Sequence, residues 1–396
     1  MGGMFGVFLA TQIQSTVLGI QVYQLVRATG SIGEAALAVG YIGLAEALPF
    51  LALTLVGGWA SDRMDRRRLC LISHLGILGA GLALVVLNLG PVRTVWPFYA
   101  VQALAGLARA FFRPASVALG SELLPKTHYA NAATWRSMMF HTATVAGPAL
   151  GALVYARFGA FATYGLMASF LLLGLVSLLK LSPRPRPQPE GGGVKLGEGL
   201  AEGIRFVFRS PILLSALSLD LFAVLFGGAI AMIPAFALDV LHVGTQGVGI
   251  LRAAPALGAV LMGLVLARRG MFPRAGRTLL WCVALFGLTW IAFALSPYFF
   301  LSIALLLIGG ALDNVSVVLR GTMVQTFTPQ EMMGRVSAVN SFFIGSSNEL
   351  GAFESGVAAR LLGLVPSLVF GGGMTLFTVA LTAWRAPQLR RLDRIS

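Results

Sequence analysis

The sequence predicts an all-α membrane protein with twelve transmembrane helices arranged as two six-helix halves. Two observations lead to this prediction. Hydrophobic residues make up 57% of the 396 residues and charged residues only 11%, whereas soluble domains carry about 25% charged residues. Apolar stretches of about 20 residues, the length that crosses a bilayer as a helix, also recur from one end of the chain to the other. Most of the protein surface is therefore expected to face lipid.

Short polar connections separate most of these stretches, so neighbouring helices are expected to be antiparallel. Long apolar runs bounded by charged or glycine-containing segments are typical of membrane spans. The expected spans are residues 5–26, 35–59, 69–90, 95–116, 134–156, 161–181, 211–237, 247–268, 277–296, 298–319, 336–357 and 363–385.

The basic residues lie on one side of this topology. With the N-terminus inside, 24 of the 29 lysines and arginines fall at inner loops or inner helix ends, 4 fall outside, and Arg252 lies within a span. Inner loops of membrane proteins carry such an excess of Lys and Arg. Both termini are therefore expected in the cytoplasm. The net charge of +14 is explained by topology, and no nucleic-acid partner is expected.

One connection is long and divides the chain. It opens with alternating proline and arginine and continues with three glycines, the composition of a semi-rigid and then flexible linker. A surface helix is expected from Leu196 to Phe208, because Leu200, Ile204 and Phe208 fall on one stripe. The expected units are an N-terminal half (1–181), a cytoplasmic linker with an amphipathic helix (182–210) and a C-terminal half (211–396).

Several classes of chemistry find no support in the sequence. The two cysteines lie in or beside apolar spans and the four histidines are scattered, so neither a disulfide framework nor a metal site is expected. A phosphate-binding G-x-x-x-x-G-K-[ST] loop, which a nucleotide-driven pump needs, is missing. We therefore expect no enzyme, no metal and no cofactor. A receptor without transport activity stays an alternative, although it would need a partner domain.

A basic segment joins the second and third spans with the spacing G-x-x-x-D-R-x-x-R-R, starting at Gly58. It resembles the signature loop between helices 2 and 3 of the major facilitator superfamily, a large family of secondary transporters. The resemblance implies the major facilitator fold, whose halves are related by pseudo-symmetry. A simple topology anchor is the alternative interpretation of the segment. Its candidate residues are Gly58, Asp62, Arg63, Arg66 and Arg67.

In the superfamily this segment closes an inner gate. The resemblance implies that Asp62 pairs with an arginine on helix 4, for which Arg113 is the matching candidate. Gly58 is expected to let two helices approach closely. The family usually has a glycine where this chain has Asp65, and this departure adds a negative charge to the turn.

A second motif lies on the fifth span. Gly147, Pro148 and Gly151 resemble the G-P-x-x-G motif of superfamily antiporters. The two glycines are four residues apart on one helix face, where a neighbouring backbone can pack, and the proline removes a backbone donor and bends the helix. Ordinary packing of small residues is the alternative to an antiporter role.

Carboxyl groups inside spans are candidates for proton coupling. An unpaired ion at the bilayer centre costs ~3 kcal/mol on insertion scales, so such a residue faces the interior, pairs or carries a proton. Glu46 and Asp220 lie inside predicted spans, and Glu46 has no basic residue near it in sequence. Both are expected to couple protons to a conformational switch. A structural salt bridge or an interhelical hydrogen bond is the alternative.

Further polar and aromatic residues complete a candidate substrate cavity. The resemblance implies that helices 1, 4, 7 and 10 line the path, and amides in an apolar span need hydrogen-bond partners. Aromatic side chains on the seventh span would add an apolar lining. The candidates are Gln12, Gln14, Gln102, Phe222, Phe226, Asp313, Asn314, Asn348 and Glu349.

The segments 309–316, 328–336 and 346–351 resemble the bacterial drug- and siderophore-exporter branch of the superfamily. The resemblance implies a secondary active transporter that exports amphipathic or aromatic small molecules by alternating access, in exchange for protons. A lipid or glycolipid flippase on the same fold stays an alternative. We expect a monomer whose partners are the small-molecule substrate, protons and membrane lipid.

Overall fold

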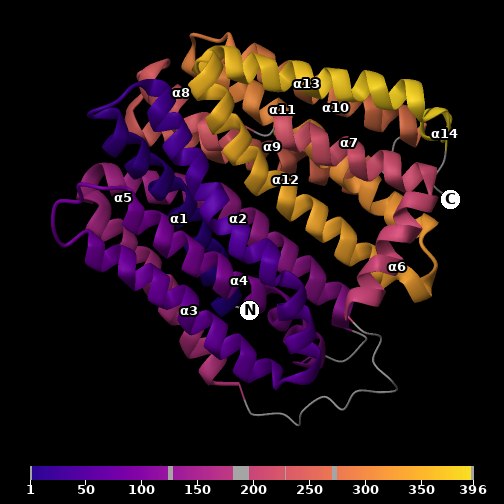
Figure 1. Ribbon diagram of the computed structural model, residues 1–396, viewed down its shortest axis with the longest axis horizontal. Helices are drawn as coiled ribbons and strands as arrows, with labels where there is room; N and C mark the ends of the chain where they lie inside the picture. Colours follow the sequence, from indigo (N-terminus) through magenta and orange to yellow (C-terminus); the bar gives the residue numbers. More distant parts are fainter. Residues whose placement is uncertain (1, 124–127, 182–195, 228, 270–273, 394–396) are drawn as a thin grey trace. The chain divides into compact units, whose positions relative to one another are not determined.

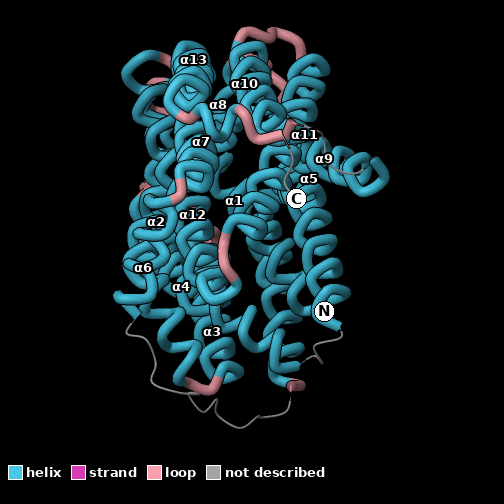
Figure 2. The backbone as a smooth tube through the Cα atoms, turned by 90° about the vertical axis from the view of Figure 1, so that its right-hand side faces the viewer, coloured by secondary structure: helices cyan, strands magenta, loops and turns pink. Residues whose placement is uncertain are grey.

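The computed structural model describes residues 2–123, 128–181, 196–227, 229–269 and 274–393. In these residues the chain forms helices joined by short loops, without any strand (Figures 1 and 2). The helices are α1 (Gly2–Arg27), α2 (Ile32–Arg63), α3 (Arg66–Leu87), α4 (Trp96–Leu123), α5 (Tyr129–Leu179), α6 (Leu196–Arg209), α7 (Pro211–Gly227), α8 (Ile233–Asp239), α9 (Gly244–Arg269), α10 (Ala275–Ala294), α11 (Phe299–Phe327), α12 (Met333–Leu362), α13 (Leu364–Arg385) and α14 (Pro387–Arg390), with the 3₁₀ turns η2 (Ala229–Met232) and η3 (Gln330–Met332).

The predicted twelve-helix, all-α fold is confirmed. Within the described residues, nine helical segments are long and apolar enough to cross a membrane. One of them, Thr134–Leu179 of α5, holds two of the predicted spans, because the backbone breaks at Gly159 with φ 75° and ψ −176°. This left-handed φ favours glycine. The other two predicted spans are α4 and α12, which carry charged residues.

Local sequence explains where several helices begin. Ser31 accepts a hydrogen bond from the backbone N–H of Glu34 at 3.2 Å, and the Glu34 carboxylate accepts one from the N–H of Ser31 at 2.9 Å. This reciprocal capping box satisfies two backbone donors at the start of α2. At the start of α3 the Asp65 carboxylate accepts from the N–H of Arg68 at 2.9 Å. The aspartate at the position where the family has glycine is therefore a helix cap.

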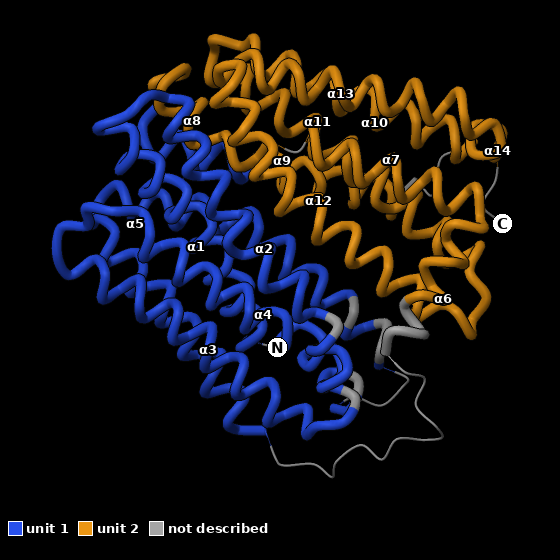
Figure 3. The backbone as a smooth tube through the Cα atoms, viewed as in Figure 1, with its two compact units in different colours: residues 1–193, 243–253 blue, residues 194–242, 254–396 orange. Residues whose placement is uncertain are grey.

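The chain separates into two compact units (Figure 3). Unit 1 comprises residues 1–193 and 243–253, and unit 2 comprises residues 194–242 and 254–396. The division into 1–181, 182–210 and 211–396 stays a prediction, and residues 182–195 of the predicted linker lie outside the described residues.

The helix expected after the linker is present as α6 in unit 2. Val207 is buried in a cluster with Leu213, Leu217 and Val336, whereas Ile204 and Phe208 are exposed. The side chain of Leu200, the third member of the predicted stripe, lies outside the described part of the chain. Glu202 pairs with an arginine on α12, and this ion pair adds a polar contact to the packing of α6.

Close helix crossings at glycines organise unit 1. A β-carbon built at Gly57 of α2 would lie 2.2 Å from the carbonyl oxygen of Ala110 on α4, and one at Gly106 of α4 would lie 2.4 Å from the carbonyl oxygen of Glu46. Such distances leave room only for glycine. The expectation that Gly58 provides the close approach is wrong, because a β-carbon there would meet nothing within 4 Å.

These neighbouring glycines give a matched test. Gly57→Ala should lower the free energy of unfolding by on the order of 1–3 kcal/mol, because the added methyl group overpacks the α2–α4 crossing. Gly58→Ala should leave it unchanged or raise it slightly, since alanine favours a helix over glycine. Thermal unfolding of the purified variants in detergent measures both. Equal midpoints for the two variants would contradict the assigned crossing.

Candidate functional site

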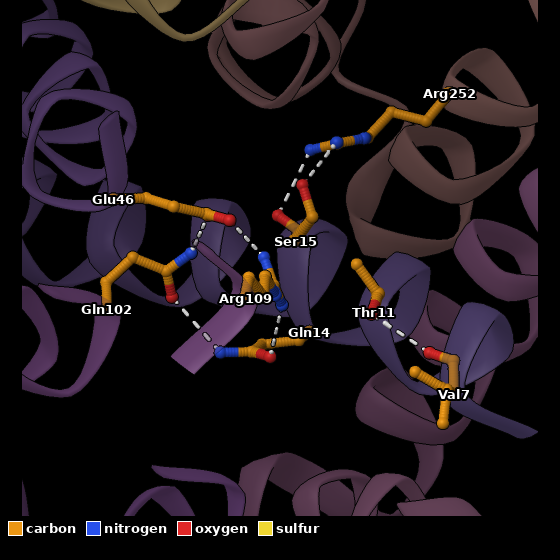
Figure 4. Close-up of polar contacts among 8 residues, drawn as sticks. All are labelled: Val7, Thr11, Gln14, Ser15, Glu46, Gln102, Arg109 and Arg252. Atoms are coloured by element: carbon orange, nitrogen blue, oxygen red, sulfur yellow. Dashed lines mark hydrogen bonds and ion pairs between the residues drawn. The ribbon is translucent and has the colours of Figure 1, made fainter. Parts of the chain in front are cut away.

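Four polar side chains form a closed hydrogen-bonded ring inside unit 1 (Figure 4). Gln14 donates through Nε2 to Oε1 of Gln102 at 3.1 Å, and Gln102 donates through Nε2 to the carboxylate of Glu46. Arg109 donates through one nitrogen to Glu46 and through the other to Oε1 of Gln14 at 3.1 Å. The ring joins α1, α2 and α4, and its one carboxylate is balanced by its one guanidinium.

The geometry of α4 brings this ring together. Gln102 and Arg109 are seven residues apart, which places them on one face of the helix two turns apart. Gly106 lies between them and allows the backbone of α4 to approach α2 at Glu46. Glu46 has no basic residue near it in sequence, but Arg109, 63 residues later on α4, forms an ion pair with it. This contact is the salt bridge that we considered as the alternative; the coupling role of Glu46 stays a prediction.

A second arginine of unit 1 has a different environment. Arg252 of α9 donates to the hydroxyl of Ser15 at 2.9 Å and to the carbonyl oxygen of Ser15 at 3.2 Å (Figure 4). Within the described ranges it has no carboxylate at ion-pair distance. Arg109 and Arg252 are therefore not equivalent: one has its charge neutralised by a carboxylate and the other is held by neutral oxygens.

The segment with the antiporter-type motif is tightly packed. A β-carbon at Gly147 would lie 2.5 Å from the β-carbon of Gln12, and one at Gly151 would lie 3.3 Å from Ile13. Gln12 also donates to the hydroxyl of Thr144 at 3.0 Å. Pro148 lies inside α5, and its carbonyl oxygen would be 2.7 Å from a β-carbon at Gly249 of α9. These contacts show the small-residue packing that we considered as the alternative; the antiporter role stays a prediction.

The segment proposed as an inner gate is mostly helical. Helix α2 continues to Arg63, whose guanidinium stacks over Trp59 at 4.7 Å, and α3 begins at Arg66. Only two residues connect the helices. This tight connection fixes where the following arginines can reach.

Two of these arginines have partners outside the segment. Arg66 pairs with Glu122 at the end of α4 at 2.5 Å and donates to the carbonyl oxygen of Ser61 at 3.2 Å. Arg67 donates to the carbonyl oxygen of Leu179 at 3.0 Å. Sequence reasoning missed Glu122, although an acid at the end of an apolar span could have indicated a partner for this basic segment.

The predicted latch between Asp62 and Arg113 stays a prediction. Asp62 belongs to helix α2, but its side chain lies outside the described part of the structure. Arg113 is an exposed residue of α4. The residues predicted for the gate belong to the end of α2, the start of α3 and the C-terminal half of α4 in unit 1.

Unit 2 contains a second charged centre. Arg320 of α11 forms an ion pair with Asp220 of α7, and their exposed fractions are only 3% and 7%. Asp313 lies seven residues before Arg320 on the same face of α11. The ion pair supplies a basic partner for Asp220, so the two predicted coupling carboxyls each lie against an arginine.

Two cavities of unit 2 border Asp313. The smaller, of about 10 Å³, is also lined by Asp220 and Cys282. The larger, of about 90 Å³, is also lined by Thr289 and Asn348. Asp313 and Asn348 are therefore brought to one cavity from α11 and α12, as expected for a polar lining.

The remaining predicted cavity residues lie elsewhere in unit 2. Asn314 lines neither cavity, and its buried Oδ1 lies near Gly263 of α9 without a hydrogen-bond partner among the described residues. Phe222 and Phe226 stack at 6.4 Å between ring centroids and also line neither cavity. Glu349 lies next to Asn348 on α12, half-buried.

A large apolar cavity in unit 1 was not predicted. Its volume is about 440 Å³, and it lies where α1, α3 and α5 begin and α4 ends. Arg136, Ser116 and Ser177 are its polar lining residues, and Cys70 also lines it. Ligand pockets have volumes of about 300–1,000 Å³. The cavity arises from the placement of several helix ends, which no single sequence pattern reveals.

In the described residues, long apolar helices that enclose an ion pair within each unit define a polytopic membrane protein. The sequence profile of the Major Facilitator Superfamily matches residues 2–352. The chain belongs to the major facilitator superfamily, and it is an integral membrane protein.

Two similar proteins carry the name Enterobactin exporter EntS. The one from Shigella flexneri is 27% identical over 388 residues, which cover 95% of this chain and 90% of that protein. The one from Escherichia coli (strain SMS-3-5 / SECEC) is 27% identical over 409 residues, with coverage of 98% and 95%.

Solved structures agree on the fold. A D-xylose-proton symporter superimposes with a TM-score of 0.73 at 15% identity, covering 99% of this chain and 97% of that chain. A bacterial homologue of the human lysosomal transporter Spinster, in an inward-facing and occupied conformation, gives a TM-score of 0.72 at 15% identity with the same coverage. At these identities the likeness concerns the fold alone.

The buried ion pair of unit 2 gives a stability test. Arg320→Gln should lower the free energy of unfolding by about 3–5 kcal/mol, because it leaves Asp220 buried without its partner. The double variant Asp220→Asn/Arg320→Gln should be less destabilised than the sum of the two single variants. Thermal unfolding of all three variants in detergent measures the coupling. Simple additivity would show that the two side chains do not interact.

Proposed function

We propose that this protein exports siderophore-like or other amphipathic, aromatic small molecules from the cytoplasm in exchange for protons. The observation that carries the proposal is the similarity to enterobactin exporters, which extends over 95% of this chain and 90% of the Shigella flexneri protein. A similarity of this extent includes both halves of a transporter, and therefore the parts that alternate between the two sides of the membrane. The activity is transport and needs no covalent chemistry.

Charged groups in the interior support coupling to protons. In each unit a carboxylate from one helix holds a guanidinium from another. Protonation of such a carboxylate weakens its ion pair, so a proton can favour one arrangement of the helices over another. Glu46 and Asp220 are the carboxyls that we propose for this role. We propose Asp220 as the more direct participant, because its ion pair lies next to a further carboxyl group, whereas the ring around Glu46 is closed and neutral.

The basic segment at the end of α2 is the proposed inner gate. Arg66 connects the start of α3 to the end of α4 through Glu122, and Arg67 connects it to the end of α5. Contacts of this kind can hold one conformation and break in another. We place this end at the cytoplasmic face of the bacterial inner membrane, where the excess of basic residues belongs. The protein would work there as a monomer in lipid.

A lipid or glycolipid flippase is the second candidate function. The 440 Å³ cavity of unit 1 favours it, because the cavity is lined mainly by apolar side chains and carries one basic residue, Arg136. An acyl chain with an anionic headgroup matches this lining. Flux that does not depend on a pH gradient would support the flippase over the exporter.

Transport of enterobactin into inside-out proteoliposomes under an imposed pH gradient tests the proposal. The unmodified protein should accumulate the substrate only with the gradient. Asp220→Asn should lower gradient-driven flux by about tenfold or more, as expected when a coupling group is removed. Glu46→Gln should also lower gradient-driven flux, but by less than Asp220→Asn, because the ring around Glu46 also holds three helices together.

The matched control is Glu202→Gln, which removes an ion-paired carboxylate of α6 outside the spans. It should transport like the unmodified protein. Flux that does not depend on the pH gradient in any variant would contradict proton exchange and favour the flippase function.

A further inference from the structure

The charged centre of unit 2 contains one more carboxyl group than it has arginines. Asp220 and Arg320 form its ion pair, and Asp313 lies beside them across a small cavity. Among the described residues, Asp313 has no basic group at ion-pair distance. Besides the two aspartates, Cys282 of α10 is the titratable group of the described residues that lines the smaller cavity. The larger cavity is lined by Asp313, by Pro255 of α9 and by Asn348 of α12.

The charge balance of this centre differs from that of the ring in unit 1. With both aspartates ionised, the centre has a net charge of −1. An uncompensated ion inside a membrane is unfavourable. A single bound proton removes this charge without breaking the ion pair. The ring around Glu46 is already neutral and gains a net charge if it binds a proton.

Of the two aspartates, Asp313 is the more accessible, because it lines both cavities. The smaller cavity has a volume of about 10 Å³, which is on the order of the space that one water molecule needs. The larger cavity of about 90 Å³ is lined by Asp313 and by the exposed Asn348, but not by Asp220. A proton that enters through the larger cavity therefore reaches Asp313 first.

The backbone fixes Asp313 in this position. A β-carbon at Gly310 would lie 1.9 Å from the carbonyl oxygen of Pro255, so α11 and α9 are in direct backbone contact one turn before Asp313. On the other side, Arg320 is held by Asp220. The carboxyl group of Asp313 is thus presented to both cavities by a helix that is constrained on either side of it.

We propose that Asp313 is a further proton-binding group of this transporter, in addition to the proposed coupling carboxyls, and that the Asp220–Arg320 ion pair responds to its charge. The proposal rests on the proton-coupled export proposed above. A hydronium ion in the larger cavity gives its proton to the Asp313 carboxylate and leaves a water molecule, and release reverses this step. When Asp313 is ionised, its negative charge competes with Asp220 for the guanidinium of Arg320 and weakens the Asp220–Arg320 ion pair. When Asp313 is protonated, this competition ends and the ion pair is stronger. One proton per cycle thereby changes the bonding between α7 and α11.

Enterobactin transport separates coupling from translocation. In Asp313→Asn proteoliposomes, accumulation driven by the pH gradient should fall by about tenfold or more, while exchange of labelled for unlabelled enterobactin stays within about twofold of the unmodified protein. Exchange needs no net proton movement, so a merely structural role would lower both. Asp313→Glu should restore gradient-driven accumulation, and Asp239→Asn, at the end of α8, is the control. Undiminished accumulation by Asp313→Asn would overturn the proposal.

Infrared difference spectra of the purified protein detect the bound proton directly. We would record them between about pH 5 and about pH 9, a range that brackets the pKa of a carboxyl group in an apolar site. A protonated-carboxyl band should be present in the unmodified protein, disappear in Asp313→Asn and shift in frequency in Asp313→Glu. A band that is unchanged in both variants would overturn the proposal. A band that behaves as expected, without gradient-driven enterobactin transport by the unmodified protein, would support the proton site and reject the proposed export.

Discussion

Pairing of buried charge across helices is the constraint on which both units depend. An arginine or glutamate inside an apolar bundle is costly unless an opposite charge and additional hydrogen bonds meet it. In unit 1 the partner of Glu46 arrives from α4, and it arrives only because Gly106 lets the two backbones approach. The helix crossing and the ion pair therefore require each other. A side chain at Gly106 would separate the helices and leave two partly buried ions without partners.

The two units meet this constraint in different ways. Unit 1 closes a neutral ring in which two glutamines relay hydrogen bonds between the ion-paired residues. Such a fully satisfied network favours one arrangement of three helices. Unit 2 keeps an additional acid next to its ion pair. A centre with unequal charges is sensitive to its surroundings, whereas a balanced ring is rigid, so one unit is suited to hold a shape and the other to change it.

Sequence patterns predicted the parts of this protein that depend on neighbours along the chain. Apolar runs predicted the nine helical segments of the described residues that are long and apolar enough to cross a membrane, because insertion depends on local composition. The partner of Glu46 escaped prediction, because it lies 63 residues away and only the fold brings it close. The sequence also could not show which of Gly57 and Gly58 lies at the α2–α4 crossing. Successive residues point about 100° apart around a helix, and the direction of the neighbouring helix was unknown. Asp65 shows the opposite case: its role as a cap is local, yet the family pattern directed attention to a missing glycine.

Cys282 has a consequence for how this centre can be observed. It lines the 10 Å³ cavity together with Asp220 and Asp313, and it is one of two cysteines in the chain. The other, Cys70, belongs to unit 1. Replacing Cys70 leaves Cys282 as the single thiol, beside Asp220 and Asp313. The rate at which a small thiol reagent modifies Cys282, when applied from one side of the membrane or the other, then reports how readily solvent enters this centre. The native chain thus carries its own reporter at the place where hydration matters most.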